Sequence, residues 1–214
     1  MRPGPRHMRR PACVGLLFVI ATSQGQAQVR GVPITASGEP EGVSTALVVA
    51  FPDDALGGVT AWAASVALQH GRLGAVATGA LVDGASAPAE AAFGLRAEVL
   101  LVRSATSPFQ VLAFTGAGTT ELGDTAREWR IPAGVSFAFR LPTPVVTLVP
   151  WLATRVQWTV LDDVTDARAG IGAGIDVTWR ARYGVRAAYD RLLLGGTDET
   201  TFGLGLTYTF TSGL

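Results

Sequence analysis

The stretch Thr201–Phe210 reads Thr-Phe-Gly-Leu-Gly-Leu-Thr-Tyr-Thr-Phe. Successive side chains of an extended strand point to opposite faces, so every second residue shares a face. One face of this stretch therefore holds only large apolar side chains, and the other holds only threonine and glycine. A half-exposed soluble sheet turns polar and charged groups outward, whereas the small-residue face here carries no charge. The pattern predicts a membrane strand that shows its large side chains to lipid and its small ones to a narrow lumen.

The first 27 residues have the features of a cleaved secretory signal. Four arginines occur among the first ten residues, an apolar run covers 14–21, and the small residues at 25–27 suit cleavage before Gln28. A helix that spans a bilayer needs about 20 apolar residues, so the run is too short for the alternative of an uncleaved anchor. We expect a signal at 1–27, an irregular leader at 28–42, strands within 43–210 and a short tail at 211–214.

Composition after the signal excludes several classes of chemistry. The single cysteine, Cys13, leaves with the signal, so disulfides, thiolate catalysis and cysteine-bound metals are excluded from the mature chain. All basic residues are arginine, and 13 of them face 17 acidic residues after residue 27, a net charge of about −4. Such mild acidity gives no electrostatic case for a nucleic-acid partner.

The apolar content is spread over many short segments. Hydrophobic residues make up 48% of the chain, yet no apolar run beyond the signal reaches the length of a spanning helix. A membrane barrel hides its hydrophobicity in this way, because each strand needs only about 9–11 residues to cross. The alternation predicts strands at 43–51, 60–69, 73–82, 93–103, 109–118, 129–140, 145–160, 168–180, 185–194 and 201–210.

Ten strands predict an all-β, single antiparallel up-and-down transmembrane barrel. Short connections near residues 70, 106, 142 and 182 alternate with longer ones near 54, 84, 123, 163 and 196, which is typical of bacterial barrels. An even strand number returns both termini to the periplasm. The first two strands are weak predictions, and strands 73–82 and 109–118 have faces too similar to orient, so eight strands is the alternative. Pro150 cannot donate to a ladder and predicts a bulge or a lapse in pairing.

Charged side chains fall on the face that would line the lumen. Arg96 and Glu98 lie two residues apart and point the same way, so they can pair with each other or with neighbouring strands. In a barrel of eight to ten strands the interior is mostly filled by side chains, so we expect a structural polar core. The alternative is a narrow, slightly anion-preferring channel lined by the excess of arginine. The predicted lumen set is Arg96, Glu98, Arg130, Arg140, Arg155, Asp176, Arg180, Arg186 and Asp190.

Tryptophans near strand ends also favour a membrane. Trp62, Trp129, Trp158 and Trp179 lie on the apolar faces, where an interfacial aromatic girdle would place them. The alternative is a soluble sandwich or a closed soluble barrel of the lipocalin type, with these side chains in an apolar core. That alternative requires polar outward faces.

The chain resembles the small β-barrel proteins of the bacterial outer membrane. Its last strand carries Gly205, Tyr208 and Phe210 in the pattern of the family's assembly signal, although Gly203 stands where a polar residue is usual and four residues follow Phe210. The resemblance implies a location in the bacterial outer membrane, contact with its lipid, and the barrel assembly machinery as a partner during biogenesis. We expect a monomer.

Few residues are available for catalysis or metal binding. After cleavage only His70 remains, in a predicted periplasmic turn, so an outer-membrane enzyme is a remote alternative and we expect none. The pairs Asp53–Asp54 and Asp162–Asp163 could hold a divalent cation, but we interpret them as solvated loop acids and expect no cofactor. The glycines at 170–174 and 203–205 precede no helix, so we interpret them as lumen residues that let the barrel curve. The expected role is structural or one of surface interaction.

Overall fold

A computed structural model of the chain describes residues 29–38, 40–56, 60–83, 89–103, 107–123, 126–162, 164–193 and 198–210. The predicted signal, 1–27, and the tail, 211–214, lie outside these residues, so the predicted cleavage stays a prediction.

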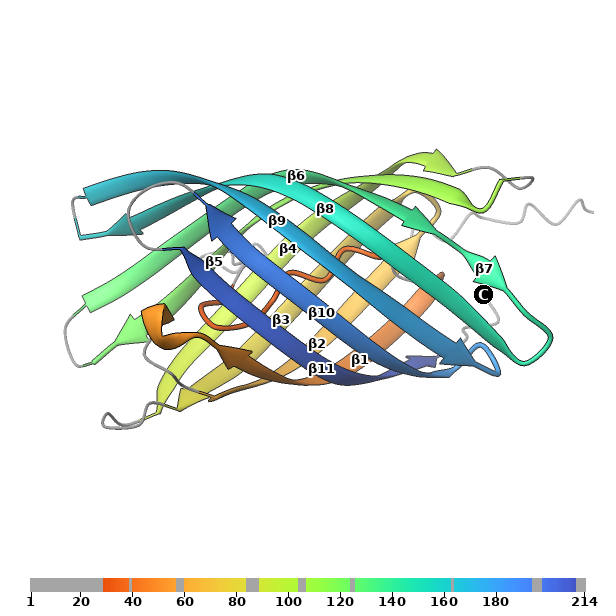
Figure 1. Cartoon of the computed structure of the whole chain (residues 1–214), viewed down its shortest axis with the longest axis horizontal. Coiled ribbons are helices and arrows are strands. Elements are labelled where there is room, and N and C mark those ends of the chain that lie inside the picture. Colours follow the sequence, from red (N-terminus) through yellow and green to blue (C-terminus); the bar gives the residue numbers. More distant parts are fainter. Residues whose placement is uncertain are drawn as a thin grey trace, which may run out of the picture.

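One antiparallel sheet closes on itself to form a barrel (Figure 1). Each long strand pairs with the next long strand along the chain, and β1 pairs with β11. The two-residue β7 lies between β6 and β8 in the sequence, but β6 pairs directly with β8. The ten long strands confirm the predicted barrel and its strand number. No helix among the described residues is long and apolar enough to cross a membrane. The elements are β1 Gly42–Pro52, η1 Asp54–Leu56, β2 Thr60–His70, β3 Leu73–Asp83, β4 Glu90–Arg103, β5 Phe109–Leu122, β6 Ala126–Phe139, β7 Leu141–Pro142, β8 Val146–Leu161, β9 Val164–Trp179, β10 Tyr183–Leu193 and β11 Glu199–Phe210.

The two faces of the wall differ as the alternation predicts. On β11, Phe202, Leu204 and Leu206 are exposed on the outside, whereas Thr201 and Gly203 are buried on the inside. The structure also orients the two strands that the sequence leaves open. The inward residues are Val76, Ala80 and Val82 on β3, and Leu112 and Phe114 on β5.

Two prolines and one bulge interrupt the ladders. β8 pairs with β6 as far as Trp151 and with β7 from Leu148, so the pairing on that side lapses at Val149 and Pro150. This confirms the lapse predicted at Pro150, which has no N–H to donate. In the same way the β5–β6 ladder skips the position of Pro132. A register shift between Leu100 and Val102 makes Leu101 a bulge on β4.

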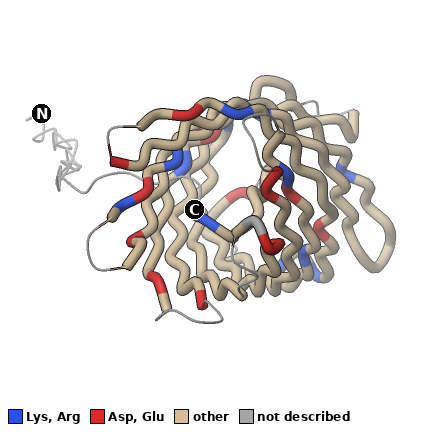
Figure 2. Tube along the Cα trace, turned by 60° about the vertical axis from the view of Figure 1, so that its left-hand side comes forward, with Lys and Arg blue, Asp and Glu red and all other residues tan. Residues whose placement is uncertain are grey.

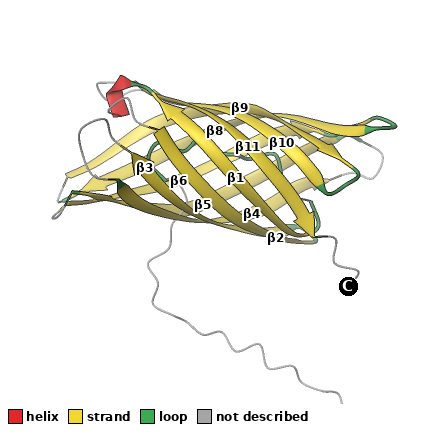
Figure 3. Ribbon diagram, turned by 90° about the horizontal axis from the view of Figure 1, so that it is seen from below, coloured by secondary structure: helices red, strands yellow, loops and turns green. Residues whose placement is uncertain are grey.

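The ends of the barrel differ less in connection length than predicted. We call the end that holds η1 the loop end, and the end where β11 finishes the turn end (Figure 3). At the loop end only residues 162 and 163 join β8 to β9, whereas at the turn end residues 140–145 separate β6 from β8. The predicted alternation of short and longer connections is therefore wrong, because the β8–β9 hairpin is tight and β7 extends the β6–β8 connection.

The leader runs through the inside of the barrel, coloured red-orange in Figure 1. Near the loop end, Val29 packs among inward residues that include Ala50, Ala61 and Val82. Near the turn end, Gly38 approaches Leu100 and Gln110. The even strand number thus places Gly42 and Phe210 at one end, as predicted, but the chain before Gly42 crosses the lumen to the opposite end. The expectation that both termini lie on the same side is wrong for Val29.

Packing around the leader makes much of the interior apolar. At the loop end Val29 joins a cluster of alanines and valines, and nearer the turn end Ile34 and Ala36 join a second cluster that contains Leu100, Phe114 and Trp151. The sequence predicts a polar lumen from the charges alone. The structure adds two apolar cores, because a segment of the chain itself fills the space between the ion pairs.

Candidate functional site: the barrel lumen

The lumen holds four groups of buried ion pairs, and Figure 2 shows basic and acidic positions distributed around the ring of strands. The first group is the pair Arg186–Asp176, whose residues stand directly opposite each other in the β9–β10 ladder. The Arg186 Nε lies 2.9 Å from Asp176 Oδ1, and Nη2 lies 2.7 Å from Oδ2. Such a two-point contact fixes the planar guanidinium against the carboxylate.

The leader contacts this same pair. The Ser37 hydroxyl donates to Asp176 Oδ2 at 2.6 Å, and the Arg186 Nη1 donates to the Thr35 hydroxyl oxygen at 3.2 Å. The Ser136 hydroxyl of β6, on another part of the wall, donates to the Ala36 carbonyl at 2.5 Å. Polar contacts to β6, β9 and β10 therefore hold three consecutive leader residues, 35–37, in the centre of the barrel.

A second pair joins strands that are not neighbours. Arg155 on β8 reaches over β9 to Asp190 on β10, with Nη1–Oδ1 at 2.6 Å and Nη2–Oδ2 at 2.8 Å. Gly170 stands opposite Arg155 in the ladder, and a Cβ atom there would lie 2.7 Å from the Arg155 Cζ. A Cβ atom at Gly174 would likewise lie 2.5 Å from the Trp151 ring.

The glycines of β9 therefore make room for large side chains of β8. We interpreted the run 170–174 from the sequence as lumen-facing residues that let the barrel curve. The structure places Gly170 and Gly172 inside and buried, and it shows that Gly170 leaves space for the Arg155 side chain. Because Gly170 has no Cβ, the guanidinium of Arg155 can pass over β9 to the carboxylate of Asp190.

A larger network lies toward the loop end. Arg130 pairs with Glu128 on its own strand and, through Nη1, with Glu199 Oε2 at 3.0 Å. Arg168 Nη1 lies 2.8 Å from Glu199 Oε1, so Glu199 joins β6 to β9. The network ends in the leader, where the Arg30 Nη1 lies 3.7 Å from Glu128 Oε2, and in Asp166, which accepts from Arg168 Nε at 2.6 Å.

A fourth pair lies on β4. Arg96 Nε donates to Glu98 Oε1 at 2.7 Å, and both side chains are buried. The Arg96 guanidinium also lies 5.9 Å from the centre of the Phe114 ring, at cation–π distance. The pairing that the two-residue spacing allows is therefore present on this strand.

Seven of the nine predicted lumen residues meet in these pairs, and two lie elsewhere. Arg180 is exposed in the turn between β9 and β10, with a left-handed backbone at φ 53°. Its prediction as a lumen residue is wrong, because β9 ends one residue earlier, at Trp179. Arg140 is half-buried just after β6, where its backbone N–H donates to the Pro108 carbonyl at 2.7 Å. The seven are Arg96, Glu98, Arg130, Arg155, Asp176, Arg186 and Asp190.

Several lumen residues are missed by the sequence reasoning. Glu128 lies two residues before Arg130, the spacing that indicates the Arg96–Glu98 pair, so the same rule could have found it. Glu199 and Arg168 stand near strand ends in segments taken for loops or strand starts, where alternation gives no facing. Nothing in the composition of 29–38 indicates that this segment lies inside the barrel.

Other predicted residues lie on the outer surface or at the ends. Trp62, Trp158 and Trp179 are exposed on the outside by 63%, 39% and 37%. Trp129 is half-buried and stands opposite Val160 in the β6–β8 ladder, two residues from the position opposite Trp158. In the assembly pattern, Tyr208 and Phe210 make an edge contact with ring centres 4.7 Å apart, and Gly205 faces the lumen.

His70 and Asp53 lie at opposite ends of the barrel. The His70 side chain is exposed at the turn end, with Nδ1 3.5 Å from Glu41 Oε1. Asp53 Oδ2 accepts the Thr200 backbone N–H at 2.8 Å, which ties the β1–β2 connection to β11. Asp163 lies outside the described residues, and those described include no cluster of three or more His, Cys, Asp or Glu side chains suited to a metal ion.

Comparison with known proteins finds likeness in fold and none in sequence. No family model and no curated protein matches the chain. The β domain of the Bordetella autotransporter BrkA matches with a TM-score of 0.51 and 12% identity, covering 78% of this chain and 98% of that one. The outer membrane enzyme PagL matches at 0.45 and 7% identity, and the KdgM porin at 0.46 and 9%; each match covers 78% of this chain and 99% of the other. The identities are so low that the BrkA likeness shows the fold alone.

The barrel is closed, its outward side chains are apolar, and charged side chains lie inside it. This is the arrangement of a barrel that sits in lipid. Water-facing barrels have the reverse arrangement, with apolar side chains inside and polar ones outside. Together with the fold match, these features show that the chain folds as a closed antiparallel barrel of the transmembrane kind, similar in fold to barrels of the bacterial outer membrane.

Proposed function

We propose that the protein is a closed outer-membrane barrel with a structural or surface-interaction role. The observation that supports this most is the leader, which lies inside the barrel and packs against the wall in two apolar clusters. The cavity between the leader and the wall, lined by Pro33, Thr35, Arg96 and Arg186, has a volume of about 40 Å³. A water molecule needs about 10–15 Å³ by this kind of measure, so the cavity holds a few waters at most.

The charge balance of the lumen supports the same proposal. Each of the buried arginines Arg96, Arg130, Arg155 and Arg186 is paired with a carboxylate. A channel that selects anions needs uncompensated positive charge along its path. These pairs instead leave the described lumen close to neutral, which weakens the alternative of an anion-preferring channel.

We also propose that the protein is not an enzyme. Its one histidine after the predicted signal, His70, is exposed at the turn end beside Glu41. A nucleophile activated by a base needs the two groups within hydrogen-bond reach in a site that positions substrate. Among the described residues, His70 lies in a hairpin whose Gly71 N–H donates to Glu41 Oε1 at 3.0 Å. This contact stabilises the turn and positions no substrate.

For biogenesis we propose that β11 is the strand read by the barrel assembly machinery and that the product is a monomer. Tyr208 and Phe210 point outward at the turn end, where a periplasmic partner would meet them. Gly205 on the inner face keeps this strand close to β1, since a Cβ there would lie 2.9 Å from the Leu47 carbonyl oxygen.

The proposed closed lumen is tested by conductance. The purified full-length barrel is inserted into planar lipid bilayers, and its folding is checked beforehand by the gel shift between boiled and unboiled samples. We expect no steady current steps. A stable ohmic conductance in the folded, unmodified protein would contradict the proposal and favour the channel.

A second candidate function, a gated small-solute channel, is favoured by one feature. The described leader residues, 29–38, 40 and 41, have no strand pairing with the wall and are held by side-chain packing, hydrogen bonds and an ion pair. Their displacement would empty the centre of the barrel while leaving the ladders intact. The unmodified protein would then conduct only under conditions that release the leader.

A further inference from the structure

The connections at the two ends of the barrel carry opposite charges. Among the described residues, the connections at the loop end contain Asp53, Asp54, Asp162 and Asp198 and no arginine. Those at the turn end contain Arg72, Arg140, Arg180 and Arg182 and no acidic residue. The connections therefore present arginines at the turn end and aspartates at the loop end. Outside the connections, Glu41 is exposed at the turn end, and Arg127 and Arg191 are exposed near the loop end.

Two of these arginines stand beside a cluster of aromatic rings. Arg180 and Arg182 are both exposed in the β9–β10 turn, which is flanked by Trp179 and Tyr183. Ring centres lie 6.2 Å apart for Trp179–Tyr183 and 5.2 Å apart for Tyr183–Tyr208, and Phe210 continues the series. Tryptophan and tyrosine favour the headgroup level of a membrane, so the cluster marks that level on this side of the wall.

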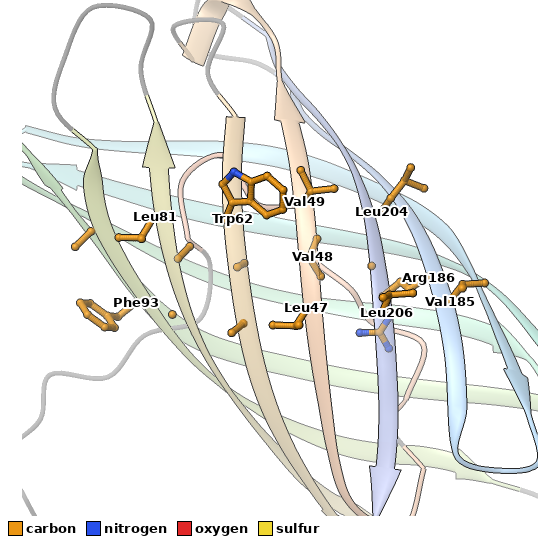
Figure 4. Close-up of a pocket in the computed structure, with 16 residues that line it drawn as sticks. Leu47, Val48, Val49, Trp62, Leu81, Phe93, Val185, Arg186, Leu204 and Leu206 are labelled. Atoms are coloured by element: carbon orange, nitrogen blue, oxygen red, sulfur yellow. The ribbon is translucent and has the colours of Figure 1, made fainter.

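An apolar groove begins at this cluster. A depression of about 390 Å³ is lined by Trp179, Tyr183, Tyr208, Thr45 and Leu47 on the outer face of β1, β9, β10 and β11. It shares Leu47 and Leu206 with a second depression, of about 890 Å³, that extends toward Trp62 (Figure 4). Both volumes lie within the range of about 300–1,000 Å³ typical of small-ligand sites.

The register explains why the wall is hollow there. In one row across the strands, Leu47, Ala64, Gly79 and Phe93 stand side by side, with small residues between large ones. Ala64 and Gly79 form the floor, while Leu47 and Phe93 form the sides (Figure 4 labels the last two). The floor lies between Trp62 and the aromatic cluster, at the depth that lipid tails occupy.

We propose that this groove binds an anionic glycerophospholipid from the leaflet at the turn end. Its phosphate would lie at Arg180 and Arg182, its glycerol region beside Tyr183 and Tyr208, and one acyl chain along Leu47 and Leu206. The chemistry is complementary at each level: guanidinium groups for phosphate, aromatic rings for the interface and apolar side chains for the tail. The proposal does not depend on whether the lumen conducts.

The test compares lipid binding by matched variants. The folded full-length protein in detergent is titrated with phosphatidylglycerol or phosphatidylcholine, and bound lipid is counted by native mass spectrometry. Each arginine near an anionic lipid surface contributes about 1 kcal/mol. The double variant Arg180→Gln/Arg182→Gln should therefore lose about 30-fold in affinity for phosphatidylglycerol, which corresponds to about 2 kcal/mol.

Two controls make the test specific. The variant Arg127→Gln/Arg191→Gln removes two exposed arginines near the loop end and should keep the preference for phosphatidylglycerol. Thr45→Trp fills the groove and should reduce the retention of both lipids, whereas Ala133→Trp, on the outward face of β6 across the barrel, should not. Folding of each variant is checked by the gel shift.

Three results would overturn the proposal. They are equal binding of the two lipids by the unmodified protein, an equal loss in both arginine double variants, and full retention of lipid by the folded Thr45→Trp variant. If a second copy of the chain covers the groove instead, Thr45→Trp would convert a dimer to a monomer in light scattering, and that result would also overturn it.

Discussion

Arg155 and Asp190 form a two-point ion pair across β9, and their side chains are only 1% and 5% exposed. Removing one partner of such a pair leaves a buried charge without compensation, at a cost of about 3–5 kcal/mol. We expect Asp190→Asn to lower the free energy of unfolding by about that amount in urea titrations followed by tryptophan fluorescence. The double variant Arg155→Met/Asp190→Leu should recover most of the loss, whereas Asp198→Asn, in the exposed Arg191–Asp198 pair, should change little. A similar loss of unfolding free energy in the double variant would show that an unpaired buried charge is not the cause of the loss in Asp190→Asn.

The space above Gly170 is a second determinant of that pair. A Cβ atom at this position would lie 2.7 Å from Arg155 Cζ, so Gly170→Ala should displace the guanidinium and destabilise the barrel by about 1–3 kcal/mol. Gly79→Ala is the matched control, since its nearest neighbour would be the Phe93 ring at an ordinary 3.7 Å. Equal unfolding midpoints for the two variants would show that a Cβ atom at position 170 fits beside Arg155, which would contradict this prediction.

The seam between β1 and β11 depends on a small residue. A Cβ atom at Gly205 would lie 2.9 Å from both the Leu47 carbonyl oxygen and the Val48 side chain. We expect Gly205→Leu to lower the yield of folded barrel, measured as the heat-shifted fraction on gels, while the outward Gly79→Leu assembles normally. Normal assembly of Gly205→Leu would contradict the placement of this residue against its neighbour.

We propose that the side chains of the leader keep the interior closed. Replacing residues 29–38 by a Gly/Ser segment of equal length removes the packing of Val29 and Ile34 in the two interior clusters. We expect steady current steps from this variant in planar bilayers. Ser37→Ala is the control, because it loses the hydrogen bond to Asp176 but keeps the apolar contacts, and it should stay silent. A folded Gly/Ser variant without conductance would show that the ion pairs alone close the lumen.

We propose that the turn end faces the periplasm and the loop end faces the outside, and single cysteines can check this orientation. The chain has no cysteine after Cys13, so each introduced thiol is labelled without background. We expect a membrane-impermeant maleimide on intact cells to label Asp83→Cys, exposed at the loop end, and to miss Arg72→Cys, exposed at the turn end. The opposite labelling pattern would reverse the proposed orientation.

Sequence reasoning finds the wall of this barrel more completely than its contents. Alternation is a local property, so it predicts the ten strands and places Arg96, Arg155 and Asp190 inside without any knowledge of partners. It fails for Arg180 because a strand end shifts by one residue. It cannot find the Arg155–Asp190 pair, since that contact passes over a whole strand, β9, and alternation says nothing about partners two strands away.

The path of the leader through the lumen is the largest feature that sequence reasoning does not predict. The leader residues are irregular, and their contacts with Ser136, Asp176 and Arg186 lie 100 or more positions away along the chain. Periodicity carries no information about such contacts. The opposite charges of the two rims, by contrast, are visible in the sequence once the strand bounds are known, because every aspartate and arginine concerned lies in a connection.

The path of the leader also constrains how the barrel is made. The leader continues directly into β1 at Gly42, and β1 pairs with β11, the last strand to be synthesised. If the leader already lies against the wall when these two strands meet, zipping of the β1–β11 seam is also the step that encloses it. The order of assembly, rather than any later threading, would then decide whether a newly made barrel is sealed or hollow.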